Sequence, residues 1–124
     1  MIRSIGLDIV DVSRVERALH KNGERFSKRI LGPDELSVLK SRVDHAQFLA
    51  GRLAAKEAAI KALGAFLDDR PALSTIQIIN EPGGQPSYSF GADVSARLAG
   101  IKCHLSISHE KTTAVAVAIF EEEK

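Results

Sequence analysis

The segment from Gln47 to Gly64 constrains the fold of this chain more than any other. Alanines and aliphatic residues dominate it, and the larger aliphatics recur at helical spacing. One apolar stripe contains Ala46, Leu49, Leu53, Ile60, Leu63 and Leu67, and alanines occupy positions 50, 54, 55, 58, 59, 62 and 65. Because alanines permit close packing on the remaining sides, we predict a buried helix at the centre of the domain.

The charged residues of this helix admit two interpretations. Lys56 falls inside the apolar stripe, and Glu57 and Lys61 lie at its edge with the spacing of a helical ion pair. Such a pair contributes about 0.2–0.5 kcal/mol, and Lys56 could extend its ammonium to solvent. Alternatively the three residues serve a site, since charges removed from water need an ionic partner, hydrogen bonds or a metal.

The N-terminal segment Ile2–Val10 has the alternation of a β-strand. The residues expected to face the core are Ile5, Leu7 and Ile9. Asp8 then projects from the opposite face, and Gly6 beside it leaves room for a ligand or another backbone. Asp8 on a strand and Glu57 on a helix would suit magnesium, which takes one or two carboxylates plus water and substrate phosphates.

A β-hairpin is predicted near the C-terminus. Lys102–His109 alternates apolar and polar residues, Glu110–Thr112 forms the turn, and Thr113–Phe120 returns as an alanine-rich strand. His109 lies at the mouth of the turn, where it is either a solvated surface residue or a contact for a bound anion.

Three collinear motifs resemble one enzyme family. They are Gly6-Leu7-Asp8-Ile9-Val10, the segment Phe48 to Ala62 with its Lys-Glu-Ala-x-x-Lys-Ala element, and Ser106-Ile107-Ser108-His109. Together they resemble the 4′-phosphopantetheinyl transferases of the holo-acyl-carrier-protein synthase type. Two segments depart from the family pattern: Ala65–Pro71 lacks its usual glycine-bearing loop, and Thr113 stands where an aromatic is common.

The resemblance implies transfer of 4′-phosphopantetheine from coenzyme A to a serine of an apo acyl-carrier protein. Asp8, Glu57 and Lys61 would be catalytic, with Asp8 and Glu57 binding Mg²⁺ and Lys61 neutralising a phosphate oxygen. The residues implied to contact the coenzyme are Arg52, Lys56, Lys61, Gly84, Gln85, Pro86 and His109. The base stays open between Glu57, a metal-bound water and no dedicated base. A homotrimer with active sites at subunit interfaces is also implied, with Arg52 reaching a neighbour's ligand.

A basic stripe precedes these motifs. Its members, spaced by three or four residues, are Arg14, Arg17, Lys21, Arg25 and Lys28. On one helix they would fall within about 80°, with Ser13 as the cap and Gly23 as a possible break. The stripe is either a solvated face or a dock for an acidic acyl-carrier protein. Nucleic acid is a poor partner, since aromatics make up 5% of the chain and no stacking platform is visible.

Composition favours one cytoplasmic domain over residues 1–124. Hydrophobic residues account for 44% and charged residues for 27%, with a net charge of +1. The single cysteine, Cys103, excludes an intramolecular disulfide and lies at a core-facing position of its strand. No apolar run approaches the roughly 18 residues of a membrane span, so we expect no membrane association.

The other segments complete an α+β prediction: a single compact domain with an antiparallel sheet and a central buried helix. A helix begins at Pro33, strands cover Leu73–Asn80 and Pro86–Phe90, and a short helix covers Ala92–Ala99. A turn at Gly83-Gly84 either supplies positive φ angles or, with Gln85 and Pro86, shapes a ligand wall. A different class of function, a non-catalytic adaptor that binds an acidic protein through the basic stripe, remains an alternative.

Overall fold

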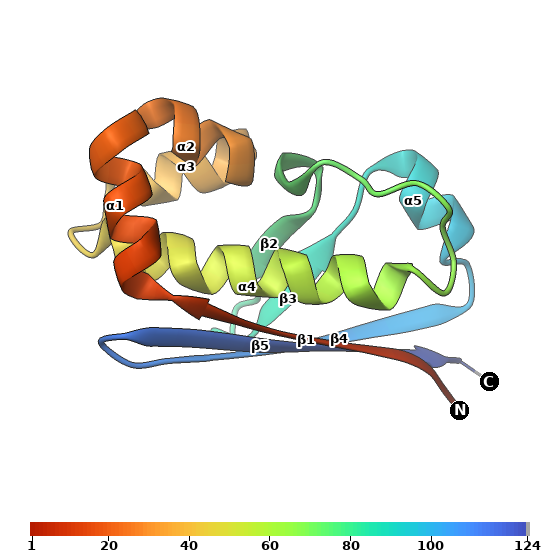
Figure 1. Ribbon diagram of the computed structural model, residues 1–124. Coiled ribbons are helices and arrows are strands. Elements are labelled where there is room, and N and C mark those ends of the chain that lie inside the picture. The colour runs from red at the N-terminus through yellow and green to blue at the C-terminus, as the bar shows by residue number, and fades with distance from the viewer. Residues whose placement is uncertain (124) are drawn as a thin grey trace.

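Helix α4, His45–Leu63, lies across one face of a three-stranded antiparallel sheet in the computed structural model, which describes residues 1–123 (Figure 1). The sheet has the strand order β1-β5-β4, with β1 at Ile2–Asp11, β4 at Ile101–His109 and β5 at Thr113–Glu122. The remaining elements are α1 Val12–Asn22, α2 Glu24–Ile30, α3 Pro33–Lys40, the 3₁₀ turn η1 Leu73–Thr75, β2 Gln77–Asn80, β3 Pro86–Ser89 and α5 Ala92–Arg97. The predicted α+β domain with a central helix and an antiparallel sheet is confirmed.

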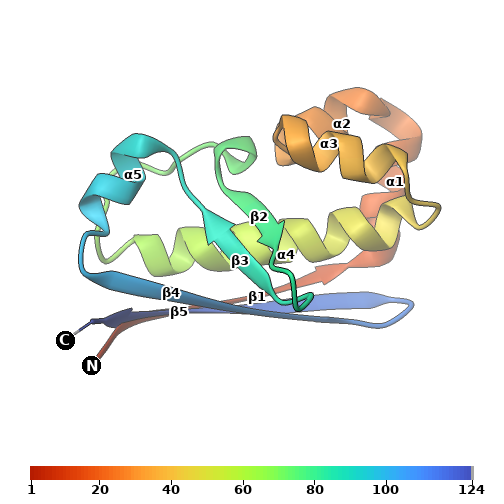
Figure 2. The ribbon, with the colours of Figure 1, turned by 180° about the vertical axis from the view of Figure 1, so that it is seen from behind.

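Helix α4 is covered on several sides. The β1-β5-β4 sheet covers one side, helices α2 and α3 lie on the opposite side, and the β2–β3 hairpin runs along the flank of α4 toward β4 (Figure 2). Alanines mediate the closest packing: Ala54 and Ala58 of α4, and Ala114 and Ala118 of β5, are all completely buried. Small side chains on both surfaces allow a helix and a sheet to approach closely, so the predicted burial of this segment is confirmed.

The predicted sidedness of β1 is wrong. Ile5 and Leu7 are each 59% exposed and Ile9 is 70% exposed, whereas Gly6 is buried. The reason is steric, because a Cβ added to Gly6 would lie 1.8 Å from the carbonyl oxygen of Ala58. Only a face without bulk can pack so closely on α4. The large aliphatic residues of β1 are therefore on the outer face of the sheet.

This outer face continues onto β5. Leu7 pairs with Val117 and Ile9 with Val115 in the antiparallel register, and both valines are only partly buried. We call the set Ile5, Leu7, Ile9, Val115 and Val117 the outer apolar face. Within one chain no element packs over it in either view of the ribbon for residues 1–123 (Figures 1 and 2).

The basic segment forms two helices. Asp11 caps α1 through a hydrogen bond from the backbone N–H of Ser13 to Asp11 Oδ1 at 3.1 Å, so the predicted cap at Ser13 is wrong. Asp11 takes this role because it ends β1 with extended backbone, as an N-cap requires. Gly23, with φ of +54°, ends α1 and starts α2, which confirms the break considered there.

The remaining predicted elements are present with shifted ends. Leu73–Thr75 forms a 3₁₀ turn, so β2 begins at Gln77, and α5 ends at Arg97 before Gly100, whose φ is +76°. Positive φ angles were one interpretation of Gly83-Gly84 in the β2–β3 turn, and this is confirmed for Gly84, whose φ is +89°, but not for Gly83. Burial raises the pKa of Cys103 to about 11, which suits a half-buried residue packed against the core. Within residues 1–123, no helix has the length and apolar character needed to cross a membrane.

We predict that Gly6→Ala destabilises the protein by about 3 kcal/mol or more, because the new methyl group must displace the α4 backbone. Urea denaturation monitored by circular dichroism measures the change. Gly83→Ala is the matched control, since a Cβ there meets nothing within 4 Å and its φ is not positive. Equal stability of the two variants would show that the contact between β1 and α4 can relax.

Candidate functional site

Asp8 and Glu57 line the same cleft beside α4. Asp8 comes from the inner face of β1 and Glu57 from α4, and the cleft has a volume of about 340 Å³. Its other lining residues are Ile9, Val10, Arg14, Val15, Ala18, Phe26 and Leu53. The structure thus brings together the two carboxylates that the sequence placed 49 residues apart, and it adds Arg14 of α1 at the edge of the cleft.

Each carboxylate is paired with a different cation. Lys61 Nζ lies 3.2 Å from Asp8 Oδ1 and donates a hydrogen bond to the carbonyl oxygen of Leu7 at 2.8 Å. Arg70 Nη2 donates to Glu57 Oε1 at 2.7 Å. The interpretation of Glu57 and Lys61 as an ordinary helical ion pair is therefore wrong, because the lysine turns toward β1.

The two carboxylates are the candidate ligands for a magnesium ion. Their side chains are 18% and 24% exposed, so both are accessible from the cleft, and their cationic partners are more than half exposed. Within residues 1–123, no group of three or more histidine, cysteine, aspartate or glutamate side chains is arranged to hold a metal. A metal here would depend on two carboxylates with water or substrate oxygens, which is the coordination that magnesium commonly adopts.

Lys56 lies outside this cleft. Its side chain is fully buried, and Nζ donates to Glu35 Oε1 at 2.5 Å, to the Ile30 carbonyl at 2.6 Å and to the Leu73 carbonyl at 3.2 Å. Burial lowers the pKa of Lys56, and the hydrogen bond with Glu35 opposes this effect. Because three oxygens already accept from the ammonium, Lys56 links α4 to the segments around α2, α3 and η1. The interpretation in which it extends into solvent is wrong.

Glu35 is the residue that the sequence analysis missed. It is 3% exposed, accepts hydrogen bonds from the backbone N–H of Gly32 at 3.0 Å and of Ile78 at 3.2 Å, and lies 3.7 Å from Arg52 Nε. A weak signal was present, since a glutamate three residues after the residue that caps a helix is typical of a capping box. Its second role as the partner of Lys56 had no signal in the local sequence.

Arg52 and His109 meet in a second, smaller cleft. This cleft, of about 120 Å³, also contains Arg42, Asp44, Gln47, Phe48, Gly51, Asn80 and Ile107. The Arg52 guanidinium lies 4.7 Å from the centre of the Phe48 ring, and burial lowers its pKa. Arg52 Nε is buried and has no hydrogen-bond partner among the described residues. Arg42 is paired within this recess with Asp44 through hydrogen bonds of 2.8 Å and 2.7 Å, so Arg52 is the arginine there that is the candidate contact for an anion.

The other predicted coenzyme contacts lie elsewhere in a single chain. Gly84, Gln85 and Pro86 occupy the β2–β3 turn and the start of β3. In the part of the chain that the structure describes, they line neither the Asp8–Glu57 cleft nor the recess around Arg52.

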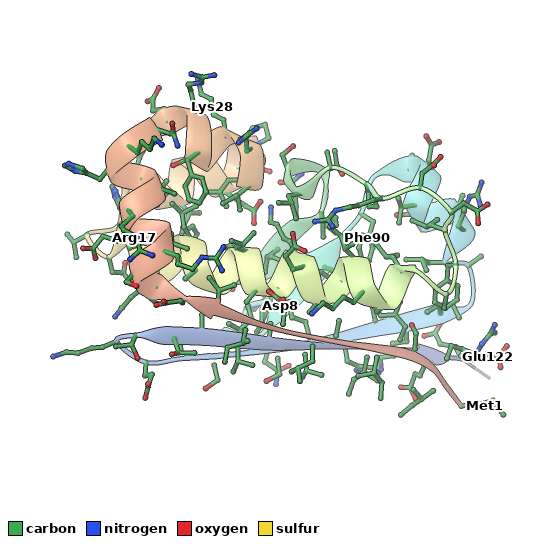
Figure 3. The ribbon with its side chains drawn as sticks, viewed as in Figure 1. Met1, Asp8, Arg17, Lys28, Phe90 and Glu122 are labelled. Carbon is green, nitrogen blue, oxygen red and sulfur yellow. The ribbon has the colours of Figure 1, made fainter. Side chains whose placement is uncertain are left out.

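The basic residues lie on α1 and α2 and are all exposed. Figure 3 shows Arg17 on α1 and Lys28 on α2, with Asp8 between β1 and α4. Arg14 lines the same cleft as Asp8 and Glu57, so one end of the basic surface adjoins the carboxylates. Lys28 lies 3.9 Å from Glu24, a separation typical of a weak surface pair.

Two accessible carboxylates with a neighbouring ammonium, and a recess lined by two arginines, are groups of the kind that phosphoryl-group transfer uses. Comparison with known proteins agrees with this class. The chain belongs to the 4′-phosphopantetheinyl transferase superfamily, whose family model matches residues 4–119. It is therefore an enzyme of the phosphopantetheinyl transferase type, as the sequence motifs implied.

Individual relatives cover nearly the whole chain. The holo-[acyl-carrier-protein] synthase of Halorhodospira halophila is 44% identical over 122 residues, covering 96% of this chain and 97% of that protein. The crystal structure of the Neisseria meningitidis holo-[acyl-carrier-protein] synthase superposes with a TM-score of 0.88 at 36% identity, covering 98% and 100% of the two chains. The Bacillus anthracis synthase, solved in complex with coenzyme A (3′,5′-ADP), has a TM-score of 0.81 at 35% identity, covering 100% and 99%.

We predict that Lys56→Met destabilises the protein by about 3–5 kcal/mol, because Glu35 remains buried without its ammonium partner. The double variant Glu35→Gln/Lys56→Met should be more stable than Lys56→Met alone, since it removes the unpaired charge. Urea denaturation of the three variants measures both effects. Lys61→Met is the control and should change stability by no more than about 1 kcal/mol, as its side chain is 54% exposed. A double variant less stable than Lys56→Met would contradict the assignment.

Proposed function

We propose that this enzyme transfers the 4′-phosphopantetheine group from coenzyme A to a serine hydroxyl of an apo acyl-carrier protein. The products are holo acyl-carrier protein and adenosine 3′,5′-bisphosphate, and the reaction depends on magnesium and supports fatty acid biosynthesis in the cytoplasm. The observation that carries the proposal is that Asp8 and Glu57 line one cleft in a chain of this superfamily. The names of its relatives support the acceptor, and the coenzyme A complex of the Bacillus anthracis relative supports the donor.

The cleft suits attack of an alcohol on a phosphoanhydride. Asp8 and Glu57 would hold the magnesium ion, which neutralises charge on the pyrophosphate of the coenzyme when bound. Lys61 is anchored by the Leu7 carbonyl, so its ammonium stays beside Asp8 and can donate to a phosphate oxygen. Positioning and charge neutralisation account for most catalysis of phosphoryl transfer, and a loose transition state requires little activation of the nucleophile. Three alternatives stay open for the base: Glu57, a water held by the metal, and no dedicated base.

The recess containing Arg52 and His109 would bind a phosphate of the nucleotide part of coenzyme A. Its support is that Arg52 and His109 line the same recess. Lys56 would act indirectly, since it holds Glu35, and Glu35 lies 3.7 Å from Arg52.

A homotrimer would complete the coenzyme site. Ile5, Leu7 and Ile9 of the outer apolar face are each more than half exposed. Exposed apolar patches of this kind are typical of surfaces that associate with another chain. The turn formed by Gly84, Gln85 and Pro86 lines neither cleft of one described chain, so its proposed contact with coenzyme A would be made across a subunit interface. Arg52 would likewise reach a ligand held by a neighbour.

The acyl-carrier protein would dock on α1 and α2. Arg14 places one end of the basic surface at the cleft, so a carrier bound there could direct its serine toward Asp8 and Glu57. The exposed members of this surface are Arg14, Arg17, Lys21, Arg25 and Lys28. Their positive charge is complementary to a small acidic protein.

We predict that Asp8→Ala and Glu57→Ala each reduce transfer at least about 100-fold while the protein remains folded, because each removes a ligand of one metal. The double variant should lose little more than either single variant, since residues that act as a unit are not additive. Intact-mass measurement of apo carrier protein with coenzyme A and magnesium detects the product. The adaptor alternative predicts no added phosphopantetheine mass even with the unmodified enzyme. Normal transfer by both single variants would exclude the metal assignment.

We predict that the triple change Arg14→Glu, Lys21→Glu and Arg25→Glu raises KM for the carrier protein several-fold and leaves KM for coenzyme A unchanged. The difference from the unmodified enzyme should shrink as salt rises, because charges are screened over about 10 Å at 0.1 M ionic strength. Arg97→Glu on α5, at the opposite end of α4, is the control for altered net charge (Figure 1). Unchanged carrier kinetics at low salt would identify the basic surface as a solvated face.

A further inference from the structure

The loop after α4 carries a cation that the function proposed above does not use. This loop, residues 64–72, departs from the family pattern and has no regular secondary structure beyond its turns. Phe66 and Leu67 anchor it, since both pack against the core and the Phe66 ring lies 6.0 Å from the Phe120 ring. Their backbone N–H groups also donate to the Leu63 carbonyl at 2.8 Å and 2.9 Å. The path of the loop is thereby fixed a few residues before Arg70.

Arg70 returns from this loop to Glu57. Its Nη2 lies 2.7 Å from Glu57 Oε1, and its side chain is 61% exposed against 24% for the glutamate. Asp68 and Asp69 line a cavity with Arg70, yet the ion pair of Arg70 is with the carboxylate of the functional cleft. Arg70 is therefore a largely exposed cation that pairs with Glu57, a proposed metal ligand.

Arg70 differs from Lys61 in how firmly it is held. Lys61 donates both to Asp8 and to the Leu7 carbonyl, so it has an anchor that does not depend on the carboxylate. For Arg70, Glu57 is the sole hydrogen-bond acceptor found within residues 1–123. An exposed ion pair of this kind contributes about 0.2–1 kcal/mol, which is small enough for a divalent cation to displace.

We propose that Arg70 is an exchangeable counter-cation of Glu57. In the metal-free enzyme the Arg70 guanidinium pairs with the Glu57 carboxylate, and a divalent cation that binds Glu57 displaces the guanidinium. The freed guanidinium then contacts a phosphate of coenzyme A, for which its planar donors are well suited. The inference rests on the proposed function, because it takes Glu57 as a metal ligand and coenzyme A as the donor substrate.

The test measures binding without turnover. Mn²⁺ replaces magnesium as the probe, and electron paramagnetic resonance of free Mn²⁺ gives its affinity for the enzyme in the absence of coenzyme A and carrier protein. Arg70→Met should bind Mn²⁺ about 1.4- to fivefold more tightly, the range expected from an exposed ion pair. With saturating Mn²⁺ and no carrier, calorimetry should show coenzyme A binding at least about threefold more weakly to Arg70→Met.

Two further variants separate the possible failures. Arg97→Met removes a neighbouring cation that lines the same cavity as Arg70, and it should change neither affinity. Glu57→Gln should weaken Mn²⁺ binding, and adding Arg70→Met to it should then have no effect on the metal. If Glu57→Gln binds Mn²⁺ normally, the proposed metal site itself is wrong. If Glu57→Gln weakens the metal but Arg70→Met leaves either Mn²⁺ or coenzyme A affinity unchanged, the exchange role of Arg70 is overturned.

Discussion

The close approach of β1 to α4 is the constraint on which the site depends. Gly6 allows it, because any side chain at that position would collide with the carbonyl oxygen of Ala58. With the strand this close to the helix, Asp8 shares a cleft with Glu57, and its carboxylate is within 3.2 Å of the Lys61 ammonium. A larger residue at Gly6 would therefore move Asp8, a proposed catalytic group, because the distance between strand and helix sets the geometry of the cleft.

A buried ionic network holds the other side of α4. Glu35 accepts hydrogen bonds from two backbone N–H groups and from Lys56, so both of its oxygens have partners inside the protein. Such networks stabilise a fold weakly in total, but removing one member is costly because the other charge remains buried. Arg52 lies at the edge of this network, with Nε 3.7 Å from Glu35 Oε2, and it also lines the recess that contains His109. Lys56 and Glu57 are consecutive on one helix but face different environments. The Lys56 side chain is buried and links α4 to neighbouring segments, whereas the Glu57 carboxylate is accessible from the cleft.

Sequence patterns predicted the helices and strands better than they predicted which side chains pack against which neighbours. The alternation of Ile5, Leu7 and Ile9 correctly indicated a strand, but it misidentified the face that packs on the helix. Alternation shows that a strand has two different faces, and burial of the bulkier face is the usual outcome. Here the partner is an alanine-lined helix, so the face without bulk packs more closely. The same limitation applied to Lys56, whose partner Glu35 is 21 residues away and on another helix.

The sequence by itself indicated the central helix, the C-terminal hairpin and a possible break at Gly23. It also identified Asp8, Glu57, Lys61 and His109 as candidates, and the family resemblance of its motifs added Arg52. These follow from local spacing, turn chemistry and motif composition, which short stretches of chain contain in full. Tertiary structure alone decided which cation pairs with which carboxylate, the burial of Lys56, the outward orientation of the β1 aliphatics and the return of Arg70 to Glu57. Those outcomes depend on distances between segments far apart in the chain. Such distances are set by how closely glycine and alanine allow backbones to pack, and only the folded protein brings all of these contacts together.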